Sequence, residues 1–104
     1  IEFDWEEIVR IRKFNPIAIK AEKGEILYSE LEKWIKKNEE IILDFDGIEA
    51  STTRFFNVSI GKLYKKYSSD IVEGIKIENA NLVAKKQMEV SKNGSRAFYQ
   101  NKGL

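Results

Sequence analysis

The sequence predicts a small α/β domain with a four-stranded mixed sheet and three helices, in the order β-β-α-β-α-β-α. An apolar run of Ile41, Ile42, Leu43 and Phe45 has the length of a strand and suits a position covered on both faces. Before and after this run, apolar residues recur at helical spacing, which is typical of helices packed on a sheet. The 104 residues are enough for one domain, residues 1–104, with a single core.

The first third of the chain carries the weakest strand signals. Residues 7–14 alternate in polarity and predict an edge strand, although acidic residues precede basic ones in the order that a helix also favours. A turn signal follows at Asn15 and Pro16, and the alternation over 16–21 predicts a second strand. Residues 24–37 then predict a helix, since one face carries Leu27, Leu31, Trp34 and Ile35.

The rest of the chain alternates strands and helices. After the strand at 40–45, residues 52–67 predict a helix with one apolar face, and residues 71–77 predict the fourth strand, with a bulge at Gly74. The last helix begins at residue 79 or 80. Its predicted buried face carries Val83, Val90, Ala97 and Phe98, and Gly94 on that face could allow a close approach to the sheet or mark a kink.

Composition excludes several kinds of chemistry. The chain has no cysteine and no histidine, so it has no disulfide, thiolate nucleophile, imidazole base or Cys/His zinc site. A hard cation could bind only through oxygen ligands. We therefore expect a protein that is not an enzyme and that needs no metal or other cofactor.

Charge and hydropathy restrict the partners. The 18 basic and 17 acidic residues leave almost no net field to attract nucleic acid or membrane surfaces. No stretch approaches the roughly 18 consecutive apolar residues of a membrane span, and no secretory signal is present. We expect a cytoplasmic location and no membrane partner. Because the sequence begins with Ile, a preceding segment remains possible.

The predicted corner between residues 41 and 64 is the best candidate for a functional site. Asp44 and Asp46 end the apolar strand, Gly47 permits a turn, and the hydroxyl residues at 51–53 are good helix N-caps. Ligands and partners of open α/β sheets meet the carboxyl ends of the strands, where this corner lies.

This corner, with its flanking segments, resembles a known family. LDFDGI followed by TTRFFNVSIGKLY is similar to the central signature of the STAS-like family of unknown function (DUF4325), small bacterial domains related to the sulfate-transporter and anti-sigma-factor-antagonist fold. PIAIKAEKGE and GIKIEN resemble the segments before and after it, so the resemblance covers roughly residues 16 to 100. It implies a STAS-like fold that opens with a hairpin near residue 16.

The resemblance also implies a regulatory hydroxyl. In STAS-domain antagonists, a serine in an Asp-Ser-Ser-Gly motif at this helix start is phosphorylated by a partner kinase. Here Thr52 falls where the motif has Asp, and Thr53 and Arg54 fall where it has its two serines, so the motif is partly kept. The possible phosphorylation sites are Thr53, Thr52 and Ser51. The simpler interpretation is that Ser51 or Thr52 caps the helix.

The expected function is a protein–protein interaction module. Its predicted partner surface contains Asp46, Glu49, Arg54 and Phe55, because two adjacent rings cannot be equally buried on a helix and we expect Phe56 to be the inner one. The resemblance implies a histidine-kinase-like ATP-binding protein as the partner. Alternatively, Asp44, Asp46 and Glu49 form an acid/base or cation site, or orient the turn by accepting backbone N–H groups. We expect Asn57 to be a buried amide that ties the helix to the preceding loop.

A second function class remains open. The last helix is locally basic, and a nucleic-acid-associated or defence-linked binding protein could use Lys85, Lys86, Lys92, Arg96 and Tyr99. The nearly balanced charge argues against this alternative. A continuous positive surface along the last helix would favour nucleic acid, whereas a neutral aromatic patch near the start of the second helix would favour a protein partner.

Overall fold

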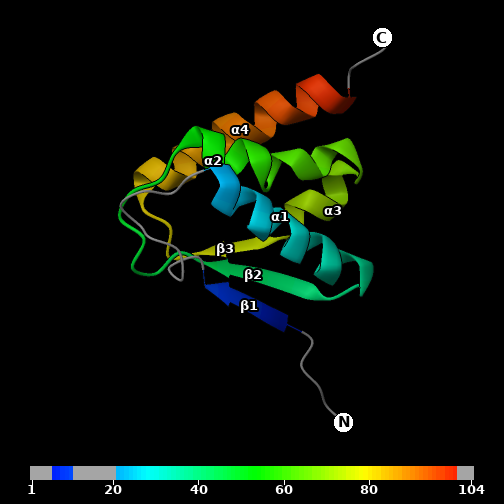
Figure 1. Ribbon diagram of the computed structural model, residues 1–104, viewed down its shortest axis with the longest axis horizontal. Helices are drawn as coiled ribbons and strands as arrows, with labels where there is room; N and C mark the ends of the chain where they lie inside the picture. Colours follow the sequence, from blue (N-terminus) through cyan, green and yellow to red (C-terminus); the bar gives the residue numbers. More distant parts are fainter. Residues whose placement is uncertain (1–5, 11–20, 101–104) are drawn as a thin grey trace.

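The sheet of the computed structural model is parallel, with helices on one side of it (Figure 1). The structure describes residues 6–10 and 21–100. Within these ranges the strands are β1 (Glu6–Arg10), β2 (Glu40–Asp44) and β3 (Lys76–Glu78), in the order β1-β2-β3. Because the strands are parallel, their carboxyl ends lie at one edge of the sheet, where the loop after β2 begins.

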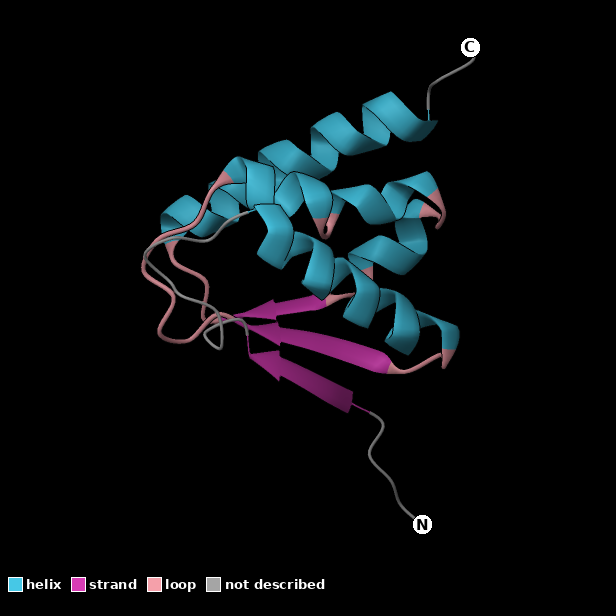
Figure 2. Cartoon of the chain, viewed as in Figure 1, coloured by secondary structure: helices cyan, strands magenta, loops and turns pink. Residues whose placement is uncertain are grey.

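The helical layer consists of several short elements and two long helices (Figure 2). The long helices are α1 (Ala21–Lys36) and α4 (Leu82–Gln100). Between them lie α2 (Thr53–Val58), the 3-10 helix η2 (Gly61–Lys65) and α3 (Ser69–Glu73). The helix α4 packs mainly against α2 and η2.

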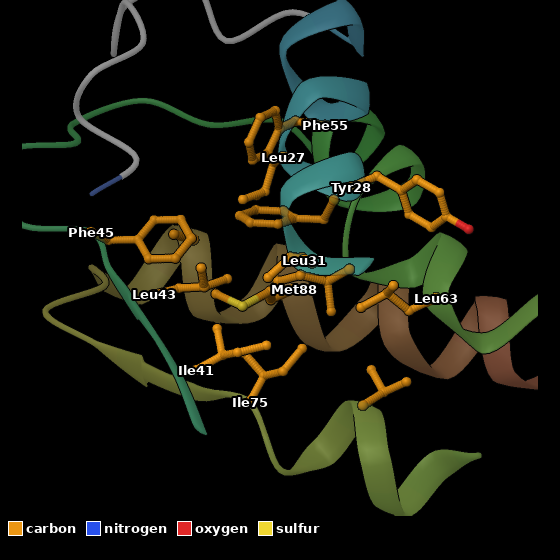
Figure 3. Close-up of a cluster of buried hydrophobic side chains, with 14 of the residues drawn as sticks. Leu27, Tyr28, Leu31, Ile41, Leu43, Phe45, Phe55, Leu63, Ile75 and Met88 are labelled. Atoms are coloured by element: carbon orange, nitrogen blue, oxygen red, sulfur yellow. The ribbon is translucent and has the colours of Figure 1, made fainter. Parts of the chain in front are cut away.

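The core lies between β2 and these helices (Figure 3). Leu27 and Leu31 of α1 meet Ile41, Leu43 and Phe45 of the central strand segment, and each of these side chains is buried. Full burial of one such side chain stabilises the fold by about 1.5–3 kcal/mol. Ile42 is also buried, although its neighbours in sequence face the helices. β2 is the central strand, as predicted, and side chains on both of its faces are buried.

The predicted four-stranded mixed sheet is wrong for the described residues, where three strands pair in parallel. The edge strand predicted at 7–14 corresponds to β1, with Ile8 opposite Ile42, and residues 11–14 lie outside the described residues. The predicted strand at 16–21, and with it the hairpin, lies outside the described residues except for Ala21, which begins α1. The predicted helix at 24–37 corresponds to α1.

The segment predicted as the fourth strand is mostly helical. Ser68 caps α3 by accepting a hydrogen bond from the Ile71 N–H, and Gly74 ends this helix instead of bulging a strand. Val72 is fully buried against the core, so tertiary packing overrides the strand preference of its β-branched side chain. Only Lys76–Glu78 remain as strand, and the described chain has four α-helices and a 3-10 helix instead of three helices.

The helix predicted at 52–67 is interrupted. Ser59 ends α2, and its hydroxyl donates to the Phe55 carbonyl over 2.8 Å. A Cβ atom on Gly61 would lie 2.5 Å from Ser95 Oγ and 2.8 Å from Ser91 Oγ, so η2 and α4 are in close contact. The predicted apolar face survives the break: Phe56, Ile60 and Leu63 are buried, and Tyr67 is partly buried.

The face predicted to be buried on the last helix is wrong. The side chains that face the core are Ala84, Met88, Ser91 and Ser95. The predicted inner residues Val83, Val90 and Phe98 are exposed instead. Small residues occupy the inner face because η2 approaches closely there. Gly94 has no such role, since a Cβ atom placed on it would meet nothing within 4 Å.

Candidate functional site

Asp44 holds the corner after β2 together. Its carboxylate is only 5% exposed and accepts hydrogen bonds from the Asp46 N–H (2.9 Å) and from Asn79 Nδ2 (3.0 Å). Gly47 adopts a φ of 86°, which confirms its predicted turn role. For Asp44, orientation of the turn is the interpretation that the structure confirms. Asp46 and Glu49 are exposed on the same loop.

Amide side chains from the β3–α4 region fasten the rest of this loop. The Ser51 hydroxyl donates to Gln87 Oε1, and Gln87 Nε2 donates to the Ser51 carbonyl over 3.1 Å. Asn81 Nδ2 donates to the Glu49 carbonyl over 3.3 Å. Sequence reasoning missed these amides, because nothing in their spacing shows that the start of α4 returns to the loop after β2.

The three candidate hydroxyls at the start of α2 have different roles. Thr52 is the N-cap, since its Oγ1 accepts from the Phe55 N–H over 3.1 Å. Ser51 is occupied by Gln87. Thr53 is half-buried, and within the described residues no hydrogen bond engages its hydroxyl. The cap interpretation is therefore confirmed for Thr52, and Thr53 is the hydroxyl that remains available.

Two predicted features of α2 are wrong. Phe55 was expected to face outward, but both Phe55 and Phe56 are 0% exposed, and their rings meet edge to face at a centroid distance of 5.3 Å. Phe55 is enclosed because α1 packs on α2, with Gly24 of α1 beside it. Asn57 is exposed instead of buried. Arg54 is exposed, in agreement with a surface role.

A groove between α2 and α4 lies next to Thr53. It encloses about 400 Å³ and is lined by Thr53, Asn57, Val90, Gly94, Ser95, Phe98 and Tyr99. We call this the α2–α4 groove. Its lining contains no charged residue. Val90 and Phe98 are each 63% exposed at its border.

The family can now be assigned. The model of the STAS-like domain of unknown function (DUF4325) matches residues 23–84. The chain belongs to this STAS-like family. The matched residues run from α1 to the first turn of α4, so they include Thr53 and Asn57 but not Val90 or Phe98.

One curated relative is similar over part of the STAS-like chain. UvrABC system protein B of Treponema denticola is 43% identical over 54 residues, which cover 52% of this chain and 7% of that protein. The chain thus matches only a small part of that relative's length. No solved structure matches the chain. Within residues 6–10 and 21–100, the STAS-like chain has no helix long and apolar enough to cross a membrane.

A second groove, on the other side of α4, carries most of the basic residues of the alternative nucleic-acid site. It encloses about 490 Å³ beside β3 and is lined by Glu73, Ile77, Lys85, Met88, Glu89, Lys92, Asn93 and Arg96. Lys86 does not line it, and Tyr99 lines the α2–α4 groove instead. The five predicted nucleic-acid residues are therefore split between different faces, and acidic residues lie among those that line this groove.

Arg96 is already engaged within the domain. Its Nη1 donates to Glu73 Oε2 over 2.6 Å, and the same carboxylate oxygen accepts from the Tyr64 hydroxyl over 3.0 Å. Burial, together with the Glu73 carboxylate, raises the pKa of Tyr64 to about 12. This network joins η2, α3 and α4. It engages the Arg96 guanidinium, a group that the alternative nucleic-acid site would need for phosphate contacts.

Proposed function

We propose that this STAS-like domain is a non-enzymatic protein-interaction module, and that it binds an amphipathic helix of a protein partner in the α2–α4 groove. The observation that carries the proposal is the uncharged groove with Val90 and Phe98 exposed at its border. Burial of large apolar side chains at the centre of a contact supplies most of the affinity in protein interfaces.

The spacing of the exposed residues favours a helix as the bound element. Val83, Val90 and Phe98 lie along one side of α4 over about 22 Å, at 1.5 Å per residue. Gly94 lies between them and has open space above it, which lets another backbone approach closely. Helix-in-groove recognition uses apolar anchors at such spacings. Arg54 follows the groove residue Thr53, and Lys86 lies about one helical turn before Val90. Acidic residues beside the apolar face of the partner helix would be complementary to these two cations.

The partner that family resemblance favours is a histidine-kinase-like ATP-binding protein, and Thr53 is the best candidate for a regulatory phosphorylation. Phosphorylation would add a charge of about −1.5 to −2 at the border of an uncharged groove, where desolvation of that charge opposes binding of an apolar face. Arg54 could alternatively pair with the phosphate. The alternative nucleic-acid function receives less support, because its basic residues are divided between faces and mixed with acidic ones.

Site-specific crosslinking followed by titration tests the proposal. A photoreactive residue at position 90 should capture a partner in the source organism, whereas the same residue at position 26, also exposed but on α1, should not. The identified protein would then be purified and titrated against the domain. Phe98→Ser should weaken binding about tenfold or more, as expected for an interface hot spot, and Ile26→Ser should not change it.

The same titration examines Thr53. Thr53→Glu should weaken binding, whereas Thr53→Val should leave it close to the parent value. Equal affinities of the parent and the Phe98→Ser variant would refute docking in the groove. Capture of nucleic acid at position 90 in place of protein would favour the alternative function.

A further inference from the structure

The side of α4 that borders the α2–α4 groove has a sequence that fits an antiparallel copy of itself. By helical spacing, this side carries Val83, Gln87, Val90, Gly94, Ala97 and Phe98. Val83 and Phe98 are equally distant along the helix from the midpoint between Val90 and Ser91, and so are Gln87 and Gly94. A two-fold axis at this midpoint therefore places Val83 of one copy opposite Phe98 of the other.

The opposed residues allow the two helices to approach closely. Gly94, with open space above it, would lie opposite Gln87, whose amide is held by Ser51 of its own domain, and the Val90 side chains would meet near the axis. Because a Cβ atom on Gly94 would meet nothing within 4 Å, the second helix can approach there without displacing any part of the domain that carries this glycine. Exposed apolar side chains thus meet at both ends of the contact, where Val83 lies opposite Phe98.

The charges of α4 do not oppose such pairing. Lys85, Glu89, Lys92 and Arg96 line the groove beside β3, on the other side of the helix. Lys86 lies at the margin of the α2 side, and in the antiparallel arrangement it would pass near Asn93 of the second copy. An uncharged face is compatible with its own copy, whereas a face with charge of one sign would repel it.

We propose that the chain self-associates as a two-fold dimer through this side of α4, so that each copy places its α4 over the α2–α4 groove of the other. The inference rests on the proposed docking function, because the α4 of the second copy is the helix that fills the groove. Self-association would then compete with binding of a partner helix. The contact follows one helix of 19 residues, so it is smaller than most permanent interfaces, and a weak, concentration-dependent dimer is expected.

The absence of cysteine permits a direct test with single cysteines introduced into the full chain. Val90→Cys lies near the proposed axis and should form a disulfide-linked dimer under mild oxidation. A mixture of Val83→Cys and Phe98→Cys proteins should form mixed disulfides, more than either protein alone. Ile26→Cys is an exposed control on α1 and should remain largely monomeric.

Sedimentation equilibrium of the cysteine-free chain supplies the second measurement. The parent should show a reversible monomer–dimer equilibrium, and Gly94→Leu should shift it to monomer by filling the space that the second helix needs. Circular dichroism should show an unchanged fold for this variant, since the site is open in the monomer.

Two results would overturn the dimer: a parent chain that is monomeric at every concentration, or crosslinking of Ile26→Cys as fast as that of Val90→Cys. A monomeric parent whose Phe98→Ser variant still loses partner affinity would refute self-association and leave the docking function supported. A dimer whose groove variants bind the partner normally would support self-association and refute the docking function.

Discussion

Replacing Phe55 by alanine should destabilise the domain as strongly as any single apolar truncation. The ring is 0% exposed, and it meets Phe56 edge to face, while Phe56 in turn lies 5.9 Å from the Phe45 ring. Truncation of a buried phenylalanine costs about 3–5 kcal/mol, because transfer energy is lost and a cavity remains. A domain of this size is commonly stable by about 5–15 kcal/mol, so the variant would lose a large part of its stability.

Phe98→Ala is the matched control, because it removes the same atoms from a ring that is 63% exposed. It loses the edge-to-face contact with Tyr99, at a centroid distance of 5.0 Å, and such a contact contributes about 0.5–1.5 kcal/mol. The two variants should therefore differ by about 1.5–4.5 kcal/mol.

Urea denaturation followed by circular dichroism measures this difference. The midpoint of Phe55→Ala should fall well below that of Phe98→Ala, with a similar dependence on urea, if both variants unfold from the same compact state. Equal midpoints would refute the burial of Phe55 between α1 and α2. A larger loss for Phe98→Ala would show that α4 presents its apolar residues to the core, as the sequence alone suggests.

Three further predictions concern packing, charge and capping. Gly61→Ala should destabilise the protein by about 1–3 kcal/mol because the new Cβ would meet Ser95 Oγ at 2.5 Å, whereas Gly94→Ala should stabilise it by about 0.5–1 kcal/mol. Thermal denaturation should therefore show a lower melting temperature for Gly61→Ala and a higher one for Gly94→Ala. Destabilisation by Gly94→Ala would contradict this prediction. Hydrogen bonds from Lys66 and Tyr67 lower the pKa of Glu32, so its contribution to stability is present above the unfolded pKa of about 4.3 and is lost as the pH falls through the lower folded pKa. Acid denaturation of Glu32→Gln should accordingly show a weaker pH dependence than that of the parent, and an identical acid profile would count against the Glu32 interaction. Thr52→Ala should cost about 1 kcal/mol through loss of the α2 cap, and Thr52→Ser should retain most of it; equal losses in chemical denaturation would exclude the cap.

Local sequence patterns determined the family, the central strand and the first helix. The segment Ile41–Phe45 is apolar except at Asp44, which indicates a central strand or a buried helix, and the adjacent turn residues favour the strand. The roles of Gly47 and Thr52 were equally readable, because a positive φ and an N-cap depend on residues close in sequence.

Tertiary structure decided the orientation of α4 and the nature of the candidate site. Periodicity assigned Val83, Val90 and Phe98 to the buried face because these apolar residues recur at helical spacing. The close approach of Gly61 instead requires small residues, and Ser91 and Ser95 supply them. Likewise, the pairing of Gln87 with Ser51 joins residues 36 positions apart, and the burial of Phe55 depends on α1. Contacts between distant segments fix which face of a helix is covered, and no local pattern in the sequence contains that information.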